Sequence, residues 1–489
     1  MRESGILMHI TSLPSPWGIG TMGRHAYAFV DFLKAAGQKV WQILPLNPTG
    51  YGDSPYQSYS AFAGNPYFID LDTLVSQGLL NTQEIANICW GNSEDRVDYG
   101  VLYNNRSKLL RRAYERAVMP AEFDVFCKDN SDWLPDFALY MALKEHHGGQ
   151  PWYLWEKPFK TREPNTLYQA RRDFGEEIRF YSYIQYLFFQ QWQSLKDYAN
   201  RNGISIIGDV PIYVPLDSVD VWSNSELFQL NENLQPKAVA GCPPDAFSDD
   251  GQLWGNPLYN WDKLASEGYS WWLRRLAAAG RMYDTVRLDH FRGFEAYWAV
   301  PYGDTTAKNG CWIKGPGIDF LTAVQQQLPE LKLIAEDLGF LTPEVFALRD
   351  AVGLPGMKVL QFAFERGEPS AYLPHKHIPN SVCYTGTHDN MPIKQWLESI
   401  EPDIMEYATA YMNLNKEEGY VWGVIRTALS SVADLCILQL QDCLELGCEA
   451  RMNFPGTQTS NNWTWRVNAA CLTDTLSKKL FDLTRLYGR

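Results

Sequence analysis

The chain has 489 residues, of which 45% are hydrophobic and 20% are charged, so it can bury a large core and long disordered segments are not expected. Its formal net charge is −14 and its lysines and arginines form no run, which argues against nucleic acid or an anionic membrane surface as a partner. No stretch approaches the roughly 18 uninterrupted apolar residues of a membrane-spanning helix.

Eight short apolar runs are predicted to be β-strands, because each ends in polar, glycine or proline residues. In chain order they cover residues 5–13, 39–46, 204–214, 284–291, 331–339, 357–364, 381–390 and 450–456. Helical patterns lie between several of them, and the two clearest stop at Gly37, which suits a C-cap, and at Gly203. This alternation predicts an α/β protein with a (β/α)8 TIM barrel. A doubly wound open sheet is the alternative, but no glycine-rich phosphate fingerprint follows the first strand.

The spacing of the predicted strands is uneven. About 160 residues separate the second strand from the third and about 70 separate the third from the fourth, and both distances exceed an ordinary loop. We therefore predict one catalytic barrel over residues 1–489, with large subdomains inserted at approximately 67–175 and 215–268 on its carboxyl-terminal face.

Charged side chains gather where the predicted strands end, which is where (β/α)8 barrels build their active sites. The residues at these ends are Asp209, Arg287, Asp289, Glu336, Asp337, His388 and Asp389. Alternation places Arg287 and Asp289 on one face of their strand, whereas His290 should point away from that face and pack. Arg287 is the only arginine or lysine among these residues, so the carboxylates would repel one another unless chemistry uses them. The pattern therefore predicts an active site.

Two chemistries suit a cluster of carboxylates. Mg²⁺ or Mn²⁺ takes oxygen ligands of this kind, but phosphoryl transfer also needs a phosphate-binding loop or a basic cluster, and neither is visible. Glycoside transfer fits better, because one carboxylate attacks the anomeric carbon while a protonated one donates to the leaving oxygen. We expect Arg287 to hold Asp289 ionised as the nucleophile. We expect partial desolvation to raise the pKa of Glu336 so that it acts as the acid.

Six segments of the chain resemble the 4-α-glucanotransferases, also called amylomaltases or disproportionating enzymes, a branch of the α-amylase superfamily. The segments are GDSPYQSYSAFAGNP (52–66), GDVPIYV (208–214), GCPPDAFSDDGQLWGNPLYNW (241–261), VRLDHFRGFEAYWAVP (286–301), IAEDLG (334–339) and TGTHDN (385–390). The resemblance runs in order from about residue 4 to residue 466. It implies a (β/α)8 barrel with insertions and without a separate C-terminal β domain.

The resemblance also implies a role for each candidate residue. Asp289 would be the nucleophile that forms a glycosyl-enzyme, Glu336 the general acid and base, and Asp389 the side chain that binds sugar hydroxyls at the cleavage subsite. The implied substrate contacts are Tyr56, Asp209, Asp245, Trp254, Arg287 and His388, with Asn462 and Trp463 as weaker candidates. Neither a cofactor nor a metal ion is implied.

The activity implied by the resemblance is retaining transfer of α-1,4-linked glucan segments among maltooligosaccharides and starch-type glucans. A hydrolase of the same fold would form the same intermediate and resolve it with water, and residue spacing does not decide between the two. An inactive glucan-binding protein is a third alternative, but it would have no reason to keep the crowded carboxylates. Nine scattered cysteines without a C-x-x-C pair predict reduced thiols in a cytoplasmic protein. The oligomeric state stays open.

Overall fold

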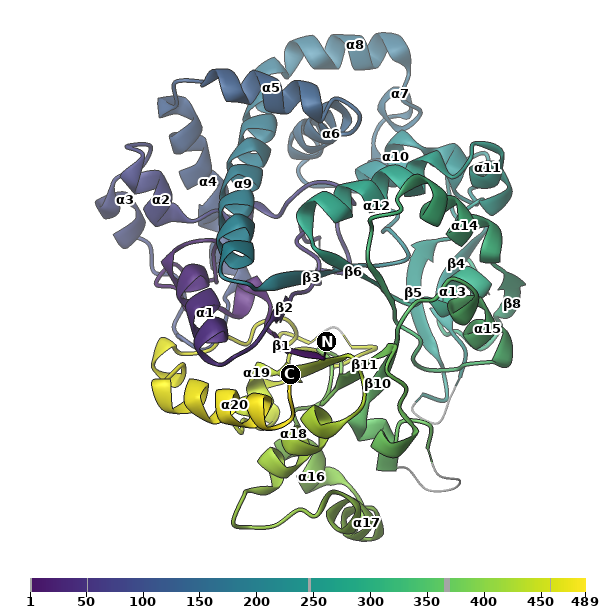
Figure 1. The fold of residues 1–489 in the computed structure, drawn as a ribbon. Coiled ribbons are helices and arrows are strands. Elements are labelled where there is room, and N and C mark those ends of the chain that lie inside the picture. Colours follow the sequence, from purple (N-terminus) through teal and green to yellow (C-terminus); the bar gives the residue numbers. More distant parts are fainter. Residues whose placement is uncertain (1, 51, 245–247, 365–369, 458) are drawn as a thin grey trace.

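The computed structural model describes residues 2–50, 52–244, 248–364, 370–457 and 459–489, and its centre is a closed barrel of parallel strands (Figure 1). Around the barrel the strands follow the order β1-β12-β11-β10-β9-β6-β3-β2. Their bounds are Glu3–Leu7 (β1), Val40–Gln42 (β2), Ser205–Val210 (β3), Thr285–Leu288 (β6), Leu333–Ala335 (β9), Gly356–Val359 (β10), Ser381–Tyr384 (β11) and Leu435–Gln439 (β12). The predicted α/β class and (β/α)8 barrel are confirmed.

The prediction for the last barrel strand is wrong. The eighth strand is β12, which pairs with β1 and β11, whereas residues 450–456 leave a short 3-10 helix and continue as a loop. The strand β12 is hard to recognise in the sequence because its apolar residues run directly into the short helix Leu440–Cys443. No change of period therefore marks where the strand ends, although Ser431 and Asp434 separate it from the helix before it.

The elements between β1 and β6 include many helices. Between β1 and β2 lie η1 (Ile10–Ser12) and α1 (Arg24–Ala35). Between β2 and β3 lie η2 (Pro66–Phe68), α2 (Leu71–Ser76), α3 (Thr82–Ala86), α4 (Tyr99–Arg116), α5 (Ala121–Asp129), α6 (Leu134–His146), η3 (Trp152–Leu154), α7 (Lys157–Lys160), α8 (Pro164–Asp173) and α9 (Gly175–Arg201). Between β3 and β6 lie α10 (Val219–Ser223), η4 (Ser225–Leu227), β4 (Ala238–Cys242), β5 (Gln252–Pro257), α11 (Trp261–Ser266) and α12 (Ser270–Met282).

The second half of the chain completes the barrel. Between β6 and β9 lie α13 (Arg292–Glu295), β7 (Ala296–Pro301), β8 (Cys311–Lys314) and α14 (Gly317–Gln327). Next come α15 (Pro343–Ala351) before β10, then η5 (Leu360–Phe364) and η6 (Pro374–Lys376) before β11. The remaining elements are α16 (Ile393–Ser399), α17 (Pro402–Met412), α18 (Tyr420–Ser430), α19 (Leu440–Cys443), η7 (Cys448–Ala450), η8 (Ala469–Cys471) and α20 (Asp474–Leu486). None of the described helices combines the length and the apolar composition that a membrane span requires.

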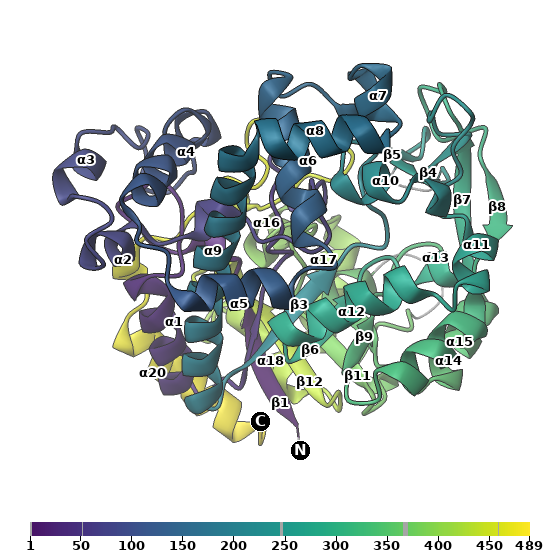
Figure 2. The same ribbon diagram turned by 90° about the horizontal axis from the view of Figure 1, so that it is seen from above.

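Additional structure lies on the side of the barrel where the strands end. Figure 2 shows α6, α7 and α8 on that side, with both chain termini at the opposite side. A four-stranded sheet, β5-β4-β7-β8, lies beside the barrel. Strands β4 and β5 belong to the connection from β3 to β6, whereas β7 and β8 belong to the connection from β6 to β9. This sheet therefore joins two connections that are separate in sequence.

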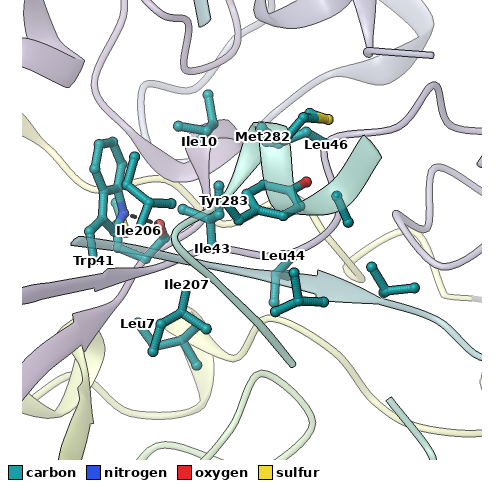
Figure 3. Close-up of a cluster of buried hydrophobic side chains, with 14 of the residues drawn as sticks. Leu7, Ile10, Trp41, Ile43, Leu44, Leu46, Ile206, Ile207, Met282 and Tyr283 are labelled. Atoms are coloured by element: carbon teal, nitrogen blue, oxygen red, sulfur yellow. Dashed lines mark hydrogen bonds between the residues drawn. The ribbon is translucent and has the colours of Figure 1, made fainter. Parts of the chain in front are cut away.

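A buried apolar cluster fixes the first three barrel strands (Figure 3). Trp41 and Ile206 are fully buried, and Nε1 of Trp41 donates to the carbonyl of Met8 at 2.7 Å. The ring of Tyr283 lies against β3 at Gly208, where an added Cβ would be 2.2 Å from the ring, so only glycine fits there. This packing holds β3 in a fixed position at Gly208, one residue before Asp209.

Candidate active site

Asp209 and Arg287 are brought together by strand register. The two residues are direct partners in the parallel pairing of β3 with β6. Nη1 of Arg287 donates to Oδ2 of Asp209 at 2.6 Å and to Oδ1 of Asp289 at 2.9 Å. Because Asp289 follows β6 directly, one guanidinium joins carboxylates from two neighbouring strands.

Exposure separates these side chains into two layers. The side chains of Arg287 and Asp209 are only 5% and 1% exposed, whereas those of Asp289 and Asp389 are 25% and 46% exposed. Asp289 and Asp389 are therefore accessible to a ligand, while Asp209 and Arg287 lie beneath the surface.

Tyr56 crosses from the loop after β2 to the same cluster. Its hydroxyl donates to Oδ2 of Asp209 at 2.7 Å, and its ring stacks on His388 with centroids 5.0 Å apart. Trp463 packs against both rings, at 5.8 Å from Tyr56 and 5.9 Å from His388. The three aromatic side chains thus form one wall beside the carboxylates. Asn462 instead braces its own loop, because its side chain bonds to the backbone of Phe454 and Thr457.

Asp389 is held by residues that sequence reasoning missed. Nδ2 of Asn453 donates to Oδ1 of Asp389 at 2.7 Å, and Nη2 of Arg451 donates to the Asp389 carbonyl at 3.0 Å. The other carboxylate oxygen, Oδ2, lies 3.4 Å from Nε2 of His388. Asn453 and Arg451 belong to the segment wrongly predicted as the eighth strand. Its composition gave a signal, since an N-F-P-G sequence is typical of a loop.

Glu336 directly follows β9 and accepts two backbone hydrogen bonds. Its Oε2 accepts from the N–H of His290 at 2.7 Å, and its Oε1 accepts from the N–H of Leu338 at 2.8 Å. His290 has a φ of 49°, a left-handed conformation that is uncommon for a residue with a side chain. The ring of His290 packs edge-on against Trp254 of β5, with ring centroids 4.8 Å apart. This histidine therefore connects the carboxylate of Glu336 to the four-stranded sheet. Its side chain packs, as predicted.

The environment sets different protonation states for Glu336 and Asp289. Burial raises the pKa of Glu336 to about 8; Arg287 opposes this and the charge of Asp289 adds to it. Burial also raises the pKa of Asp289, where Arg287 acts in the opposite direction and Asp389 in the same one. Asp289 contacts a guanidinium, whereas the hydrogen bonds that Glu336 accepts from the described residues come from backbone N–H groups. A proton shared by this pair therefore rests on Glu336. The site presents a carboxylic acid beside a carboxylate.

One predicted member of the cluster lies elsewhere. Asp337 turns to the outside of the barrel, where its Oδ2 pairs with Nη1 of Arg349 and its Oδ1 accepts from the N–H of Met357 at 2.7 Å. The expectation that all of the acids at the strand ends face one site is wrong for Asp337, because consecutive residues at the end of β9 point to opposite sides. Asp245, a predicted substrate contact, lies outside the described residues. Among the described residues, no group of three or more acidic, histidine or cysteine side chains is arranged to hold a metal ion.

Comparison with known proteins assigns the chain to a family. The sequence profile of the 4-alpha-glucanotransferases matches residues 8–473. The chain belongs to the 4-alpha-glucanotransferase family. A 4-alpha-glucanotransferase from Clostridium butyricum is 48% identical over 99% of this chain and 100% of its own length. One from Thermus thermophilus is 47% identical over 95% of each chain.

A solved structure agrees with this 4-alpha-glucanotransferase over its whole length. The amylomaltase from Streptococcus agalactiae, solved in complex with acarbose, is 42% identical, covers 100% of both chains and has a TM-score of 0.97. The resemblance found in the sequence segments is therefore confirmed. The chain is an enzyme that transfers glucan segments, and the hydrolase and the inactive binding protein are not favoured.

Proposed function

We propose that this glucanotransferase works by double displacement, with Asp289 as the nucleophile and Glu336 as the acid and base. Asp289 attacks the anomeric carbon of an α-1,4-glucan while Glu336 gives its proton to the leaving 4-oxygen. Glu336 then removes the proton from the 4-hydroxyl of an acceptor glucan, which attacks the same carbon and releases Asp289. The configuration of the anomeric carbon is inverted twice and is therefore retained overall. The observation that carries this assignment is the pairing of one guanidinium-bound carboxylate with one protonated neighbour.

The surrounding residues support these two. We infer that Arg287 and the buried Asp209 orient Asp289, and that Asp389 binds sugar hydroxyls that change position as the ring flattens in the transition state. Tyr56, His388 and Trp254 offer ring faces and polar atoms to the sugar at the cleavage subsite. We assign Asp245 to the substrate cleft on the family resemblance alone.

We propose maltooligosaccharides and longer α-1,4-glucans as donors and acceptors. The family name and the acarbose complex of the Streptococcus agalactiae amylomaltase support a glucan substrate. We also propose that the insertions at residues 67–175 and 215–268 form the walls of the substrate cleft, because α6, α7 and α8 lie on the side where the barrel strands end (Figure 2). The cysteines are free thiols, which supports a cytoplasmic location.

A product ladder tests transfer directly. Maltotriose incubated alone should give longer oligosaccharides together with glucose, without a rise in total reducing ends. Maltose and glucose with rising reducing ends would instead identify a hydrolase.

Covalent trapping tests the residue roles. In Glu336→Gln, α-maltosyl fluoride should still glycosylate the enzyme, because fluoride leaves without acid assistance, but transfer to an acceptor should be slow. Intact mass spectrometry should then detect one added maltosyl unit, and peptide mapping should place it on Asp289. The double variant with Asp289→Asn is the matched control and should gain no mass. An adduct on another residue would remove Asp289 from the mechanism.

A further inference from the structure

Two aromatic rings lie side by side at the surface near the active site. Trp312 is on β8, the outer strand of the four-stranded sheet, and Phe340 is in the connection that follows β9. Phe340 is 55% exposed and Trp312 is partly exposed, and neither ring belongs to the apolar core. The rings are stacked, with centroids 6.2 Å apart and an interplanar angle of 26°. Paired rings at the surface that the core does not use are typical of a binding site.

Buried neighbours hold the ring of Trp312 in one orientation. The guanidinium carbon of Arg292 lies 3.9 Å from the centroid of Trp312 and 5.9 Å from that of Phe340. Arg292 is only 4% exposed, and its Nε and Nη1 have no hydrogen-bond partner among the described residues. Contact with an aromatic ring therefore stabilises this buried cation. Trp298, which is directly opposite Trp312 in the pairing of β7 with β8, packs edge-on against it at 5.2 Å.

The two rings are close to the catalytic residues along the chain. Phe340 comes four residues after Glu336, so their Cα atoms are at most roughly 14 Å apart. Arg292, which supports the rings, comes three residues after Asp289. The connections that follow β6 and β9 therefore supply both the reacting carboxylates and the paired rings.

The four-stranded sheet runs from the cleavage point to the rings. Its β5 edge carries Trp254, which packs against His290 beside Glu336, and its β8 edge carries Trp312. The two edges are three strand spacings apart, roughly 14 Å. A glucan that reacts at Asp289 and extends along this sheet would meet the rings only after several glucose units.

The surroundings of the rings suit a neutral sugar chain. Aromatic faces pack against the C–H groups of a sugar ring, and polar side chains beside them bond to its hydroxyls. Lys314 is two residues beyond Trp312 on the same face of β8 and pairs with Glu295. Because the charges of this pair cancel, the surface beside Trp312 favours an uncharged polymer over an anion.

We propose that Trp312 and Phe340 form a distal glucan subsite on the acceptor side of the cleavage point. This inference rests on the proposed function, in which Glu336 protonates the leaving chain and then activates the acceptor, so the connection after β9 faces that chain. The rings bind the part of a long acceptor that is remote from its reacting 4-hydroxyl. Since this contact is the same before and during the reaction, it lowers KM for long acceptors and leaves kcat unchanged.

Fluoride release with acceptors of two lengths tests this subsite. Saturating α-maltosyl fluoride is the donor, so fluoride counts its turnovers, and the acceptor is glucose or maltoheptaose. The wild type should have a lower KM for maltoheptaose than for glucose. Trp312→Ala and Phe340→Ala should each raise KM for maltoheptaose roughly 3- to 10-fold, with KM for glucose and both kcat values unchanged. Trp312→Phe and Phe340→Tyr keep a ring and should have KM values close to that of the wild type.

Phe481→Ala is the matched control. Phe481 is 40% exposed and lies on α20, on the side of the barrel where the chain termini lie (Figure 2), so this variant should behave as the wild type does with both acceptors. An unchanged KM for maltoheptaose in Trp312→Ala and Phe340→Ala would overturn the subsite and leave the roles of Asp289 and Glu336 intact. Equal rises of KM for glucose and maltoheptaose would also overturn it, because glucose cannot reach the rings. Absence of transfer by the wild type would refute the proposed function together with the subsite.

Discussion

Nη1 of Arg287 lies 2.9 Å from Oδ1 of Asp289 and holds the carboxylate that we assign as the nucleophile. The same nitrogen lies 2.6 Å from Asp209, whose side chain is almost fully buried. The pair is therefore part of a three-residue unit in which one cation serves two acids. Its charge opposes the effect of burial on Asp289 and keeps that carboxylate available for attack.

Removing this cation should change the pH dependence of the enzyme. In Arg287→Gln the pKa of Asp289 should rise further, because a guanidinium contact lowers a carboxylate pKa by roughly 1–3 units. The acidic limb of the kcat/KM profile for maltotriose should move upward by about one pH unit or more, since Asp289 must be ionised to attack. Arg287→Lys keeps the charge and should shift the limb less. Superimposable profiles for Arg287→Gln and the wild type would contradict the role of this contact.

Glu336 should determine the basic limb. Its pKa of about 8 means that the proton needed by the leaving group is lost as the pH rises through that value. The kcat/KM for maltotriose should therefore fall above about pH 8. With α-maltosyl fluoride, whose leaving group needs no proton, the basic limb of kcat/KM should disappear. A basic limb that is the same for both donors would assign it to another group.

Asn453 should affect catalysis through Asp389. Asn453→Ala removes the 2.7 Å hydrogen bond to Oδ1 of Asp389, and a hydrogen bond to a charged group contributes about 1.5–3 kcal/mol. We expect kcat/KM for maltotriose to fall roughly 10- to 100-fold while thermal unfolding changes little. Asn461→Ala, an exposed neighbour on the same loop, is the control and should retain full activity. Equal activity of the two variants would show that Asp389 needs no support from Asn453.

Gly356 should be essential for stability rather than for chemistry. An added Cβ would lie 2.5 Å from Oδ2 of Asp337 and 2.6 Å from Nη1 of Arg349, so Gly356→Ala would force apart a buried ion pair. We expect a loss of roughly 1–3 kcal/mol or more in the free energy of unfolding, measured with denaturant. Gly175→Ala is the matched control, because no atom lies within 4 Å of its added Cβ, and it should be neutral or slightly stabilising. A stable Gly356→Ala would mean that Arg349 can move aside freely.

Much of the barrel and its charged rim could be predicted without coordinates. Arg287 and Asp289 share a face because alternate residues of a strand always do, and Glu336 follows an apolar strand in the same way. The position of the last barrel strand could not be predicted in this way. β12 runs directly into the short helix α19, and local periodicity carries no boundary signal at that end of the strand.

By itself, the sequence determined which side chains each strand delivers to the rim, since that depends only on backbone geometry along a few residues. Only the tertiary structure decided which of them meet. Asn453 reaches Asp389 across 64 residues, and Asp337 leaves the cluster to pair with Arg349. The proton on Glu336 likewise depends on burial and on charges from other strands. These contacts form only when the barrel closes and its loops pack, because they join residues that are distant in the chain.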